Sequence, residues 1–291
     1  MKYNKGIIHN LVRSTLKQLV NNKGGYYIYP KFRVMRDLCI KKCYQKYGND
    51  AIFVNLGAGE YFYHPRWKNY DLYEPALESG ISHFNNYDLR GVDNIEFPES
   101  DVQIIYCSHT LEHIPEKNIR QTLKRIFRSL KVGGVFRVIV PDAKLILNAY
   151  DNKDFEFFMP YESWFRKRNA KKIYLEDYLL QLLATPKCRI YNEELRHADS
   201  LNGEEVKQKR RCLNDKEFLD YLREGLEGNN IYGTDYFNWF DSEKLMSLLK
   251  DAGFSDVYRS AFGQSKELVM RQVPLFDKTL PYLSLYVEAV K

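Results

Sequence analysis

Long apolar runs are missing from this chain of 291 residues. The longest, such as FRVIVP at residues 136–141, are far shorter than the roughly 20 residues that a membrane-spanning helix needs. The first 25 residues also lack the apolar segment and the cleavage site of a secretory signal peptide. We therefore expect a protein without a membrane span that stays in the cytoplasm.

Cysteine is scarce, and its spacing matches no metal-binding motif. An odd number of cysteines in a chain without an export signal is typical of reduced thiols. None of the five stands in a CxxC pair, so we expect neither disulfide bonds nor a structural zinc ion. The five are Cys39, Cys43, Cys107, Cys188 and Cys212.

Charge of one sign does not dominate either. The 44 basic and 38 acidic residues leave a net charge of +6, which favours anionic ligands without requiring a nucleic acid. The basic runs at 165–172 and 207–211 are more typical of solvated helix faces than of a nucleic-acid groove, so we do not expect a nucleic acid as partner. By contrast, tyrosine is abundant at 23 residues, which suits a pocket for a polar ligand.

The apolar pattern divides the chain into four parts. Residues 1–50 form an N-terminal helical segment, with apolar side chains at helical spacing over 7–20 and a stop at Gly24 and Gly25. A basic amphipathic helix of this kind can lie on a membrane surface, but packing against its own protein is the commoner outcome. The remaining parts are a core over 51–150, an insertion over 151–230 and a C-terminal completion of the core over 231–291.

Short apolar runs alternate with helical segments in the core. This alternation predicts an α/β fold with a mostly parallel sheet covered by helices. A helix is expected over 116–130, ended by Gly133 and Gly134, and another over 241–252, capped by Asp241 and ended by Gly253. The expected strands lie at residues 52–56, 70–73, 102–107, 135–140 and 283–290.

A glycine turn follows the first of these strands, in the segment FVNLGAGE. Gly57 and Gly59 allow a ligand to approach the backbone closely, although a tight turn that merely needs glycine is the alternative. Asp71, about a dozen residues on, can accept hydrogen bonds from both hydroxyls of a ribose. Because no third glycine follows in register, we expect a nucleoside ligand without a pyrophosphate. Asp88 can accept a hydrogen bond from an adenine amino group, or alternatively can cap the turn before Gly91.

Together these segments resemble the class I S-adenosylmethionine-dependent methyltransferases, in particular bacterial enzymes linked to polysaccharides or sugar-containing natural products. The match covers residues 52–142 and 234–291. The resemblance implies a Rossmann-like, seven-stranded sheet whose last strand is antiparallel, a helical insertion, and S-adenosylmethionine as cofactor. Asn55 departs from the pattern, because many members carry an acidic residue there. The implied cofactor contacts are Asn55, Gly57, Ala58, Gly59, Asp71, Asp88, Leu89 and Ser108.

The acceptor side is less well defined by motifs. Residues 107–110 are Cys-Ser-His-Thr, where resembling enzymes that methylate exocyclic amines carry Asn-Pro-Pro-Tyr or Asp-Pro-Pro-Tyr. This difference favours a hydroxyl as acceptor, and the resemblance implies a sugar, a glycan or another small molecule that carries it. We expect methyl transfer by in-line displacement. We expect the insertion at 151–230 to cover the site and select the acceptor. A ligand-binding protein on the same fold, without catalysis, is the alternative.

His109 is the candidate catalytic residue, because it follows a central strand and can collect the proton of a hydroxyl. Its alternative role is a backbone wall of the adenosine pocket. His109, Glu112 and His113 also spell H-x-x-E-H, the zinc motif of inverted zincin peptidases. That motif requires both histidines on one helix, whereas His109 directly follows a strand and is expected in the turn. We therefore expect no metal, and expect Glu112 and His113 to open the following helix.

Overall fold

The computed structural model describes residues 42–59, 64–72, 85–90, 99–162, 165, 170, 172–190, 200–226, 236–272 and 275–291. The chain divides into two compact units, residues 1–49 and residues 50–291. The predicted helix over 7–20 and its glycine stop lie outside the described residues. In the described ranges, no helix is both long and apolar enough to cross a membrane.

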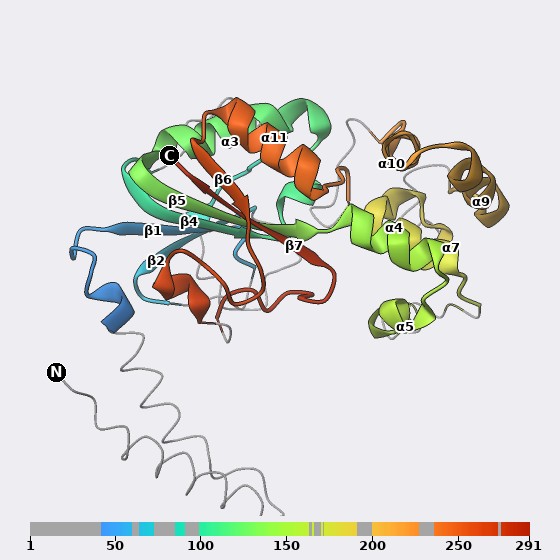
Figure 1. The fold of residues 1–291 in the computed structure, drawn as a ribbon, viewed down its shortest axis with the longest axis horizontal. Helices are drawn as coiled ribbons and strands as arrows, with labels where there is room; N and C mark the ends of the chain where they lie inside the picture. Colours follow the sequence, from blue (N-terminus) through green and yellow to red (C-terminus); the bar gives the residue numbers. More distant parts are fainter. Residues whose placement is uncertain are drawn as a thin grey trace, which may run out of the picture. The chain divides into compact units, whose positions relative to one another are not determined.

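The second unit is built on one seven-stranded sheet with the order β3-β2-β1-β4-β5-β7-β6 (Figure 1). All pairs among β1 to β5 are parallel, and β7 runs antiparallel between β5 and β6. This confirms the predicted Rossmann-like sheet, mostly parallel with an antiparallel last strand. The strands are β1 (Ile52–Leu56), β2 (Trp67–Asp71), β3 (Asn85–Asn86), β4 (Val102–Ser108), β5 (Leu130–Pro141), β6 (Asp256–Arg259) and β7 (Ser284–Val290).

Alternate side chains of the central strands give the sheet two different faces. On the first face, Val54, Ile105 and Val138 are fully buried in an apolar cluster. Two helices, α3 (Glu116–Ser129) and α11 (Ser242–Ala252), lie over this face (Figure 1). The expected limits of α11 are confirmed, since the Asp241 side chain accepts a hydrogen bond from the Lys244 amide and Gly253 ends the helix at φ 116°.

The expected stop of α3 at Gly133 and Gly134 was wrong. The helix ends at Ser129 and β5 begins at the next residue, so both glycines lie inside the strand. The β4–β5 register shifts here, because Val102 pairs with Leu130 while Ile104 pairs with Val135. Gly133 has φ 74°, and a Cβ on Gly134 would lie 2.8 Å from the Lys131 carbonyl oxygen. The two glycines therefore permit a bulge in the strand.

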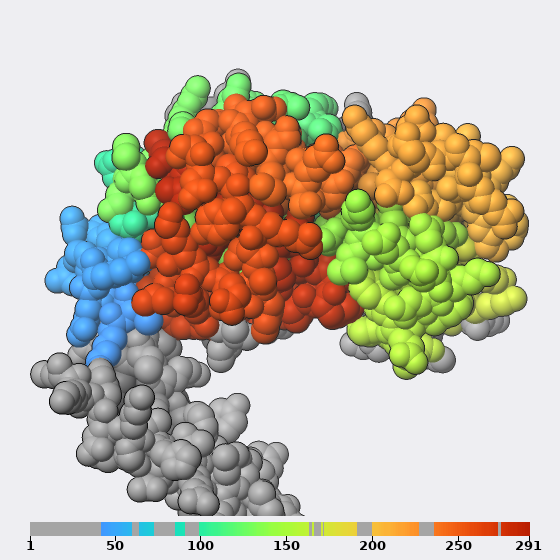
Figure 2. Space-filling model, viewed as in Figure 1, coloured from blue at the N-terminus to red at the C-terminus, as the bar shows by residue number. Residues whose placement is uncertain are grey.

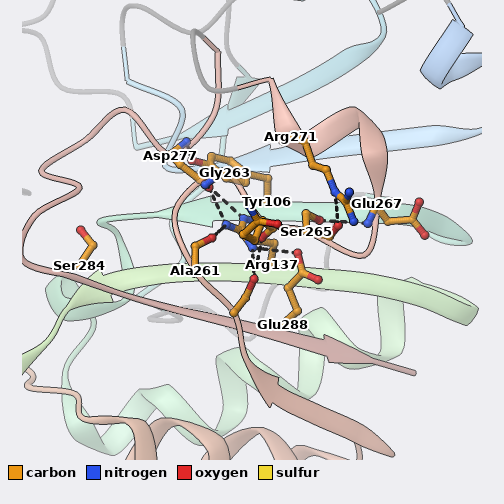
Figure 3. A network of polar contacts seen from close by, with 12 residues as sticks. Tyr106, Arg137, Ala261, Gly263, Ser265, Glu267, Arg271, Asp277, Ser284 and Glu288 are labelled. Atoms are coloured by element: carbon orange, nitrogen blue, oxygen red, sulfur yellow. Dashed lines mark hydrogen bonds and ion pairs between the residues drawn. The ribbon is translucent and has the colours of Figure 1, made fainter. Parts of the chain in front are cut away.

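The second face of the sheet has a charged core centred on Arg137 of β5 (Figure 3). Its guanidinium contacts both oxygens of Asp277, at 3.1 and 2.5 Å, and Glu288 of β7 at 2.9 Å. All three side chains are fully buried, and such a cluster is stable only when its hydrogen bonds are satisfied. The Gly263 amide donates to Asp277, and the Asp277 amide donates to the Tyr106 hydroxyl. The connection between β6 and β7 is thereby anchored on this face.

Beyond the carboxyl end of β5 the chain forms a helical lobe, defined here as the described part of residues 143–226 (Figures 1 and 2). The lobe has an apolar core of its own, which includes Phe158, Leu179 and Phe218 and is completed by Trp239 and Leu283. The prediction of a helical insertion is confirmed. The α-helices of the lobe are α4 (Ala143–Asp151), α5 (Phe155–Phe158), α7 (Leu175–Leu183), α9 (Gly203–Cys212) and α10 (Asp215–Arg223).

Candidate cofactor and acceptor site

The glycine turn begins where β1 ends. The Gly57 amide donates to the Tyr70 carbonyl at 2.9 Å, and both Gly57 and Gly59 have positive φ, 65° and 59°. The two glycines differ in their surroundings. A Cβ on Gly57 would lie 1.8 Å from the Thr110 Oγ1 atom, whereas a Cβ on Gly59 would meet no atom of the described residues within 4 Å. Gly57 is therefore required by packing against Thr110, whereas the described residues leave room beside the backbone of Gly59.

Asp71 lies beside this turn, at the carboxyl end of β2. Its Oδ2 atom accepts a hydrogen bond from the Gly59 amide at 2.7 Å, and Oδ1 accepts one from the Leu72 amide at 2.8 Å. These bonds fix the carboxylate next to the backbone of Gly59. The fold thus brings together the glycine turn and the acidic residue that were predicted to bind a nucleoside. An oriented carboxylate beside a glycine turn fits the ribose of such a ligand.

The loop that follows β3 adjoins Asp71, since the Tyr87 amide donates to the Asp71 carbonyl at 2.8 Å. Asp88 in this loop accepts hydrogen bonds from the Arg90 amide and guanidinium. Burial acts to raise the pKa of Asp88, but these hydrogen bonds and the charge of Arg90 lower it overall. This agrees with the turn-capping alternative for Asp88. Leu89 is buried in the apolar cluster under α3, and cofactor contacts by both residues stay predictions.

Asn55 and Ser108 lie on β1 and β4, two neighbouring strands in the middle of the sheet. Asn55 is buried, and Ser108 is the last residue of β4, where its carbonyl accepts a hydrogen bond from Thr110 Oγ1 at 3.1 Å. The carboxyl ends of parallel strands are where open α/β sheets bind their ligands. Both residues and Ala58 are thus near the expected edge, and their contact with the cofactor stays a prediction.

His109 leaves β4 with a left-handed backbone, φ 51°, and its amide donates to the Ile139 carbonyl at 2.8 Å. The ring points towards protein groups on both sides. Its Nε2 atom lies 2.8 Å from Ser284 Oγ, and its Nδ1 atom lies 3.3 Å from Oε1 of Glu112. With a side-chain exposure of 7%, the imidazole is nearly buried. His109 and Glu112 therefore form a buried pair at the carboxyl end of β4.

Glu112 is the functional candidate that the sequence interpretation missed. It was expected to open the following helix, but α3 begins at Glu116, and Glu112 lies in a separate 3-10 turn, η2 (Leu111–His113). Its side chain is 1% exposed, and among the described residues neither carboxylate oxygen accepts a hydrogen bond. Burying a carboxylate without such bonds lowers the stability of the fold. Its presence here therefore points to a functional role. The sequence feature that could have identified Glu112 is the His-x-x-Glu spacing directly after an apolar strand.

The charge of this carboxylate reaches two tyrosines, Tyr236 and Tyr161. Burial and the charge of Glu112 raise the pKa of Tyr236, whose ring stacks on His113 with centroids 5.0 Å apart. The pKa of Tyr161 is raised by burial, by Tyr236 and by Tyr282, with a smaller contribution from Glu112. Tyr161 belongs to the helical lobe, in η3 (Met159–Tyr161), and Tyr236 lies just after the lobe. We call Glu112, His113, Tyr161, Tyr236 and Tyr282 the tyrosine cluster.

The zinc interpretation of H-x-x-E-H does not fit this geometry. His109 precedes η2 with a positive φ, and its ring faces Ser284 and Glu112. His113 lies in η2 and stacks on Tyr236, so the two histidines do not share one face of an α-helix. In the parts of the chain that the structure describes, no group of three or more His, Cys, Asp or Glu residues is arranged to hold a metal ion.

Residues 52–259, more than half of the chain, match a family model described as a methyltransferase domain. The chain belongs to this family. It is a class I S-adenosylmethionine-dependent methyltransferase, and the prediction of S-adenosylmethionine as cofactor is confirmed. No curated protein matches the chain in sequence.

Several solved structures are similar over most of the chain. An S-adenosylmethionine-dependent methyltransferase from Mesorhizobium loti is 13% identical, with 87% of this chain and 96% of that chain covered and a TM-score of 0.37. A methyltransferase from Archaeoglobus fulgidus, also dependent on S-adenosylmethionine, is 12% identical, with 92% and 100% covered and a TM-score of 0.37. Human N-acetylserotonin methyltransferase is 13% identical, with 82% and 47% covered and a TM-score of 0.36. At these values, the acceptors of those enzymes say nothing about the acceptor of this chain.

Proposed function

We propose that this methyltransferase acts on a hydroxyl of a sugar or glycan-like acceptor, and that His109 and Glu112 together form its base. A hydroxyl is a weak nucleophile and needs a group that takes its proton. The observation that carries the proposal is the buried pair at the carboxyl end of β4, with Nδ1 of His109 3.3 Å from Oε1 of Glu112.

The cofactor half of the proposed site is the edge formed by β1, β2 and β4. Asp71 would accept hydrogen bonds from the ribose hydroxyls, and the open backbone at Gly59 would allow close approach. When bound, S-adenosylmethionine supplies a methyl group activated by a positively charged sulfur. The other residues proposed to line this half are Asn55, Gly57, Ala58, Asp88, Leu89 and Ser108.

The part of the proposed site that takes up the proton consists of His109 Nδ1 and Glu112 Oε1, which face each other. In its neutral form His109 has one ring nitrogen that can accept a proton, and the Glu112 carboxylate lies beside it. A proton taken from the acceptor hydroxyl would pass to this pair, because both Nδ1 and the carboxylate oxygens of Glu112 can accept one. Both side chains are nearly buried, so little water competes for either atom.

The tyrosine cluster supports a polyhydroxylated acceptor. Tyrosine offers both an apolar ring face and a hydroxyl, a combination that suits a sugar ring. Tyr161 of the helical lobe contributes to the cluster, which supports the prediction that the insertion at 151–230 helps to select the acceptor. We also propose a cytoplasmic location and a role in polysaccharide biosynthesis. The thiols of Cys107 and Cys212 agree with a reducing compartment.

Identification of the methylated product tests the acceptor. Purified protein would be incubated with methyl-labelled cofactor and with fractions of an extract from its source organism, separated into glycans, sugar nucleotides and amines. We expect label on oxygen in a sugar-containing product, located by mass spectrometry and NMR. Label on nitrogen would contradict the hydroxyl proposal. Cofactor binding without transfer to any fraction would favour the alternative of a non-catalytic ligand-binding protein.

The base is tested by single-turnover methyl transfer to that product's precursor. Loss of a general base typically reduces the rate by about a hundredfold to ten-thousandfold. We expect a loss of this order for His109→Gln and for Glu112→Gln, with cofactor affinity nearly unchanged in calorimetry. Ser255→Ala is the control, because its hydroxyl bonds the carbonyl of Val290, at the end of β7 opposite Ser284. A weakened cofactor affinity with a normal rate at saturating cofactor would instead identify His109 as a wall of the cofactor pocket.

A further inference from the structure

Ser284, the first residue of β7, lies among three possible hydrogen-bond partners. Its Oγ atom is 2.8 Å from the Leu280 carbonyl oxygen, 3.4 Å from that of Thr279, and 2.8 Å from Nε2 of His109. A serine hydroxyl has one hydrogen to donate, and carbonyl oxygens can only accept. The hydroxyl must therefore donate to the Leu280 carbonyl, since otherwise two acceptors would face each other at 2.8 Å. The hydrogen between Ser284 and His109 is then the one on Nε2.

We infer that Ser284 is a positioning residue that fixes His109 as the Nε2–H tautomer, so that Nδ1 is the atom that takes up and releases a proton. A neutral imidazole has one N–H, so a hydrogen on Nε2 leaves Nδ1 as the acceptor. Nδ1 is also the nitrogen that faces Glu112. The role of Nδ1 as the base in methyl transfer rests on the proposed function of His109. The assignment of the Nε2–H tautomer does not.

The Leu280 carbonyl has a fixed direction because the chain before it is anchored. Asp277, three residues earlier, is held by Arg137 and by the Tyr106 hydroxyl, and it is fully buried (Figure 3). Both Asp277 and Leu280 have positive φ, 58° and 44°. Such backbone conformations persist only where the surrounding contacts impose them. The charged core around Arg137 thus supports the carbonyl that orients Ser284.

Glu112 favours the tautomer opposite to the one that Ser284 imposes on His109. A carboxylate beside Nδ1 favours the opposite tautomer, because an Nδ1–H group can donate to it. In the described parts of the chain, the groups facing the imidazole are Glu112 of η2 and Ser284 of β7. Without the hydroxyl of Ser284, Glu112 would be the remaining partner of the ring among the described residues, and it favours a hydrogen on Nδ1. Ser284 therefore keeps Nδ1 unprotonated in the neutral ring.

NMR of the ring nitrogens tests this inference without knowledge of the acceptor. The protein would be labelled with 15N-histidine and recorded from pH 6 to 10, with the His109 signals assigned by their loss in His109→Gln. We expect Nε2 to remain protonated and Nδ1 to lose its proton as the pH rises. An Nδ1–H tautomer at high pH, or a ring protonated on both nitrogens over the whole range, would overturn the inference.

Variants of Ser284 separate positioning from general stability. Ser284→Thr keeps the hydroxyl and should keep the Nε2–H tautomer, whereas Ser284→Ala should shift the neutral ring to Nδ1–H. Ser255→Ala is a matched control, since its hydroxyl bonds the Val290 carbonyl at the other end of β7. An alanine variant with an unchanged tautomer would refute the role of Ser284. If that variant does not fold, the wild-type and threonine spectra still decide. Failure of the base proposal would appear separately, as a normal methyl-transfer rate in His109→Gln.

Discussion

Alanine substitutions at the two glycines of the turn after β1 should have unequal effects. Both residues have positive φ, so both substitutions meet the same backbone penalty, about 1 to 2 kcal/mol. Only at Gly57 does the new methyl group also collide with a neighbour. It would lie 1.8 Å from Oγ1 and 2.8 Å from Cβ of Thr110. Rotation of the Thr110 side chain moves Oγ1 away but not Cβ, so the backbone itself must shift.

The collision sets the size of the difference. Overpacking of a well-packed site costs about 1 to 3 kcal/mol. We therefore expect Gly57→Ala to lower the free energy of unfolding by about 2 to 5 kcal/mol, and Gly59→Ala by about 1 to 2 kcal/mol. Urea unfolding at pH 7 followed by circular dichroism measures both values. Calorimetry with S-adenosylmethionine, on the folded fraction, measures whether each substitution also weakens cofactor binding.

A double-mutant cycle with Thr110→Gly isolates the contact, because removal of the threonine side chain makes room for the methyl group. The cycle should give a coupling energy of about 1 to 3 kcal/mol. Equal destabilisation by Gly57→Ala and Gly59→Ala, together with no coupling to Thr110, would refute the packing argument. A loss of cofactor affinity in Gly59→Ala alone would support Gly59 as the point of ligand approach.

Three further predictions address other contacts. Asp71→Ala should weaken cofactor binding by about 1 to 3 kcal/mol in calorimetry, and equal wild-type affinity for the cofactor and its 2′-deoxy analogue would contradict the ribose contact. Tyr161→Phe should raise the KM for the acceptor without changing the cofactor Kd, and an unchanged KM would remove Tyr161 from acceptor binding. Burial acts to raise the pKa of Glu116, but Lys244 and Arg223 lower it below 4.5 overall, so stability should fall as the pH drops below this value. Urea titrations from pH 6 to 3 should show a smaller fall in Glu116→Gln.

Local sequence patterns determined most of the fold. The apolar run at residues 52–56 became β1 with the same limits, because a strand buried on both faces is marked by its composition alone. The limits of α11 were likewise predictable from its cap and its terminal glycine. For β2 the pattern was less complete: the strand begins at Trp67, three residues before the expected start, because polar residues interrupt its apolar run. The neighbouring positions of Gly59 and Asp71 followed from the topology of parallel strands.

The environment of His109 depends on tertiary structure. Its ring meets Ser284, which is 175 residues away in the sequence, only because β7 inserts antiparallel beside β5. The burial of Glu112 could not be predicted either, since its exposure depends on how the helical lobe and the segment after it pack around η2. Gly57 shows the same limit, because the sequence indicated a turn but not the threonine packed against it. Local periodicity thus determined the helices and strands, and with them the sheet edge that carries Gly59 and Asp71. Contacts between distant segments, by contrast, decided the pairing of His109 with Glu112 and the orientation of the imidazole ring.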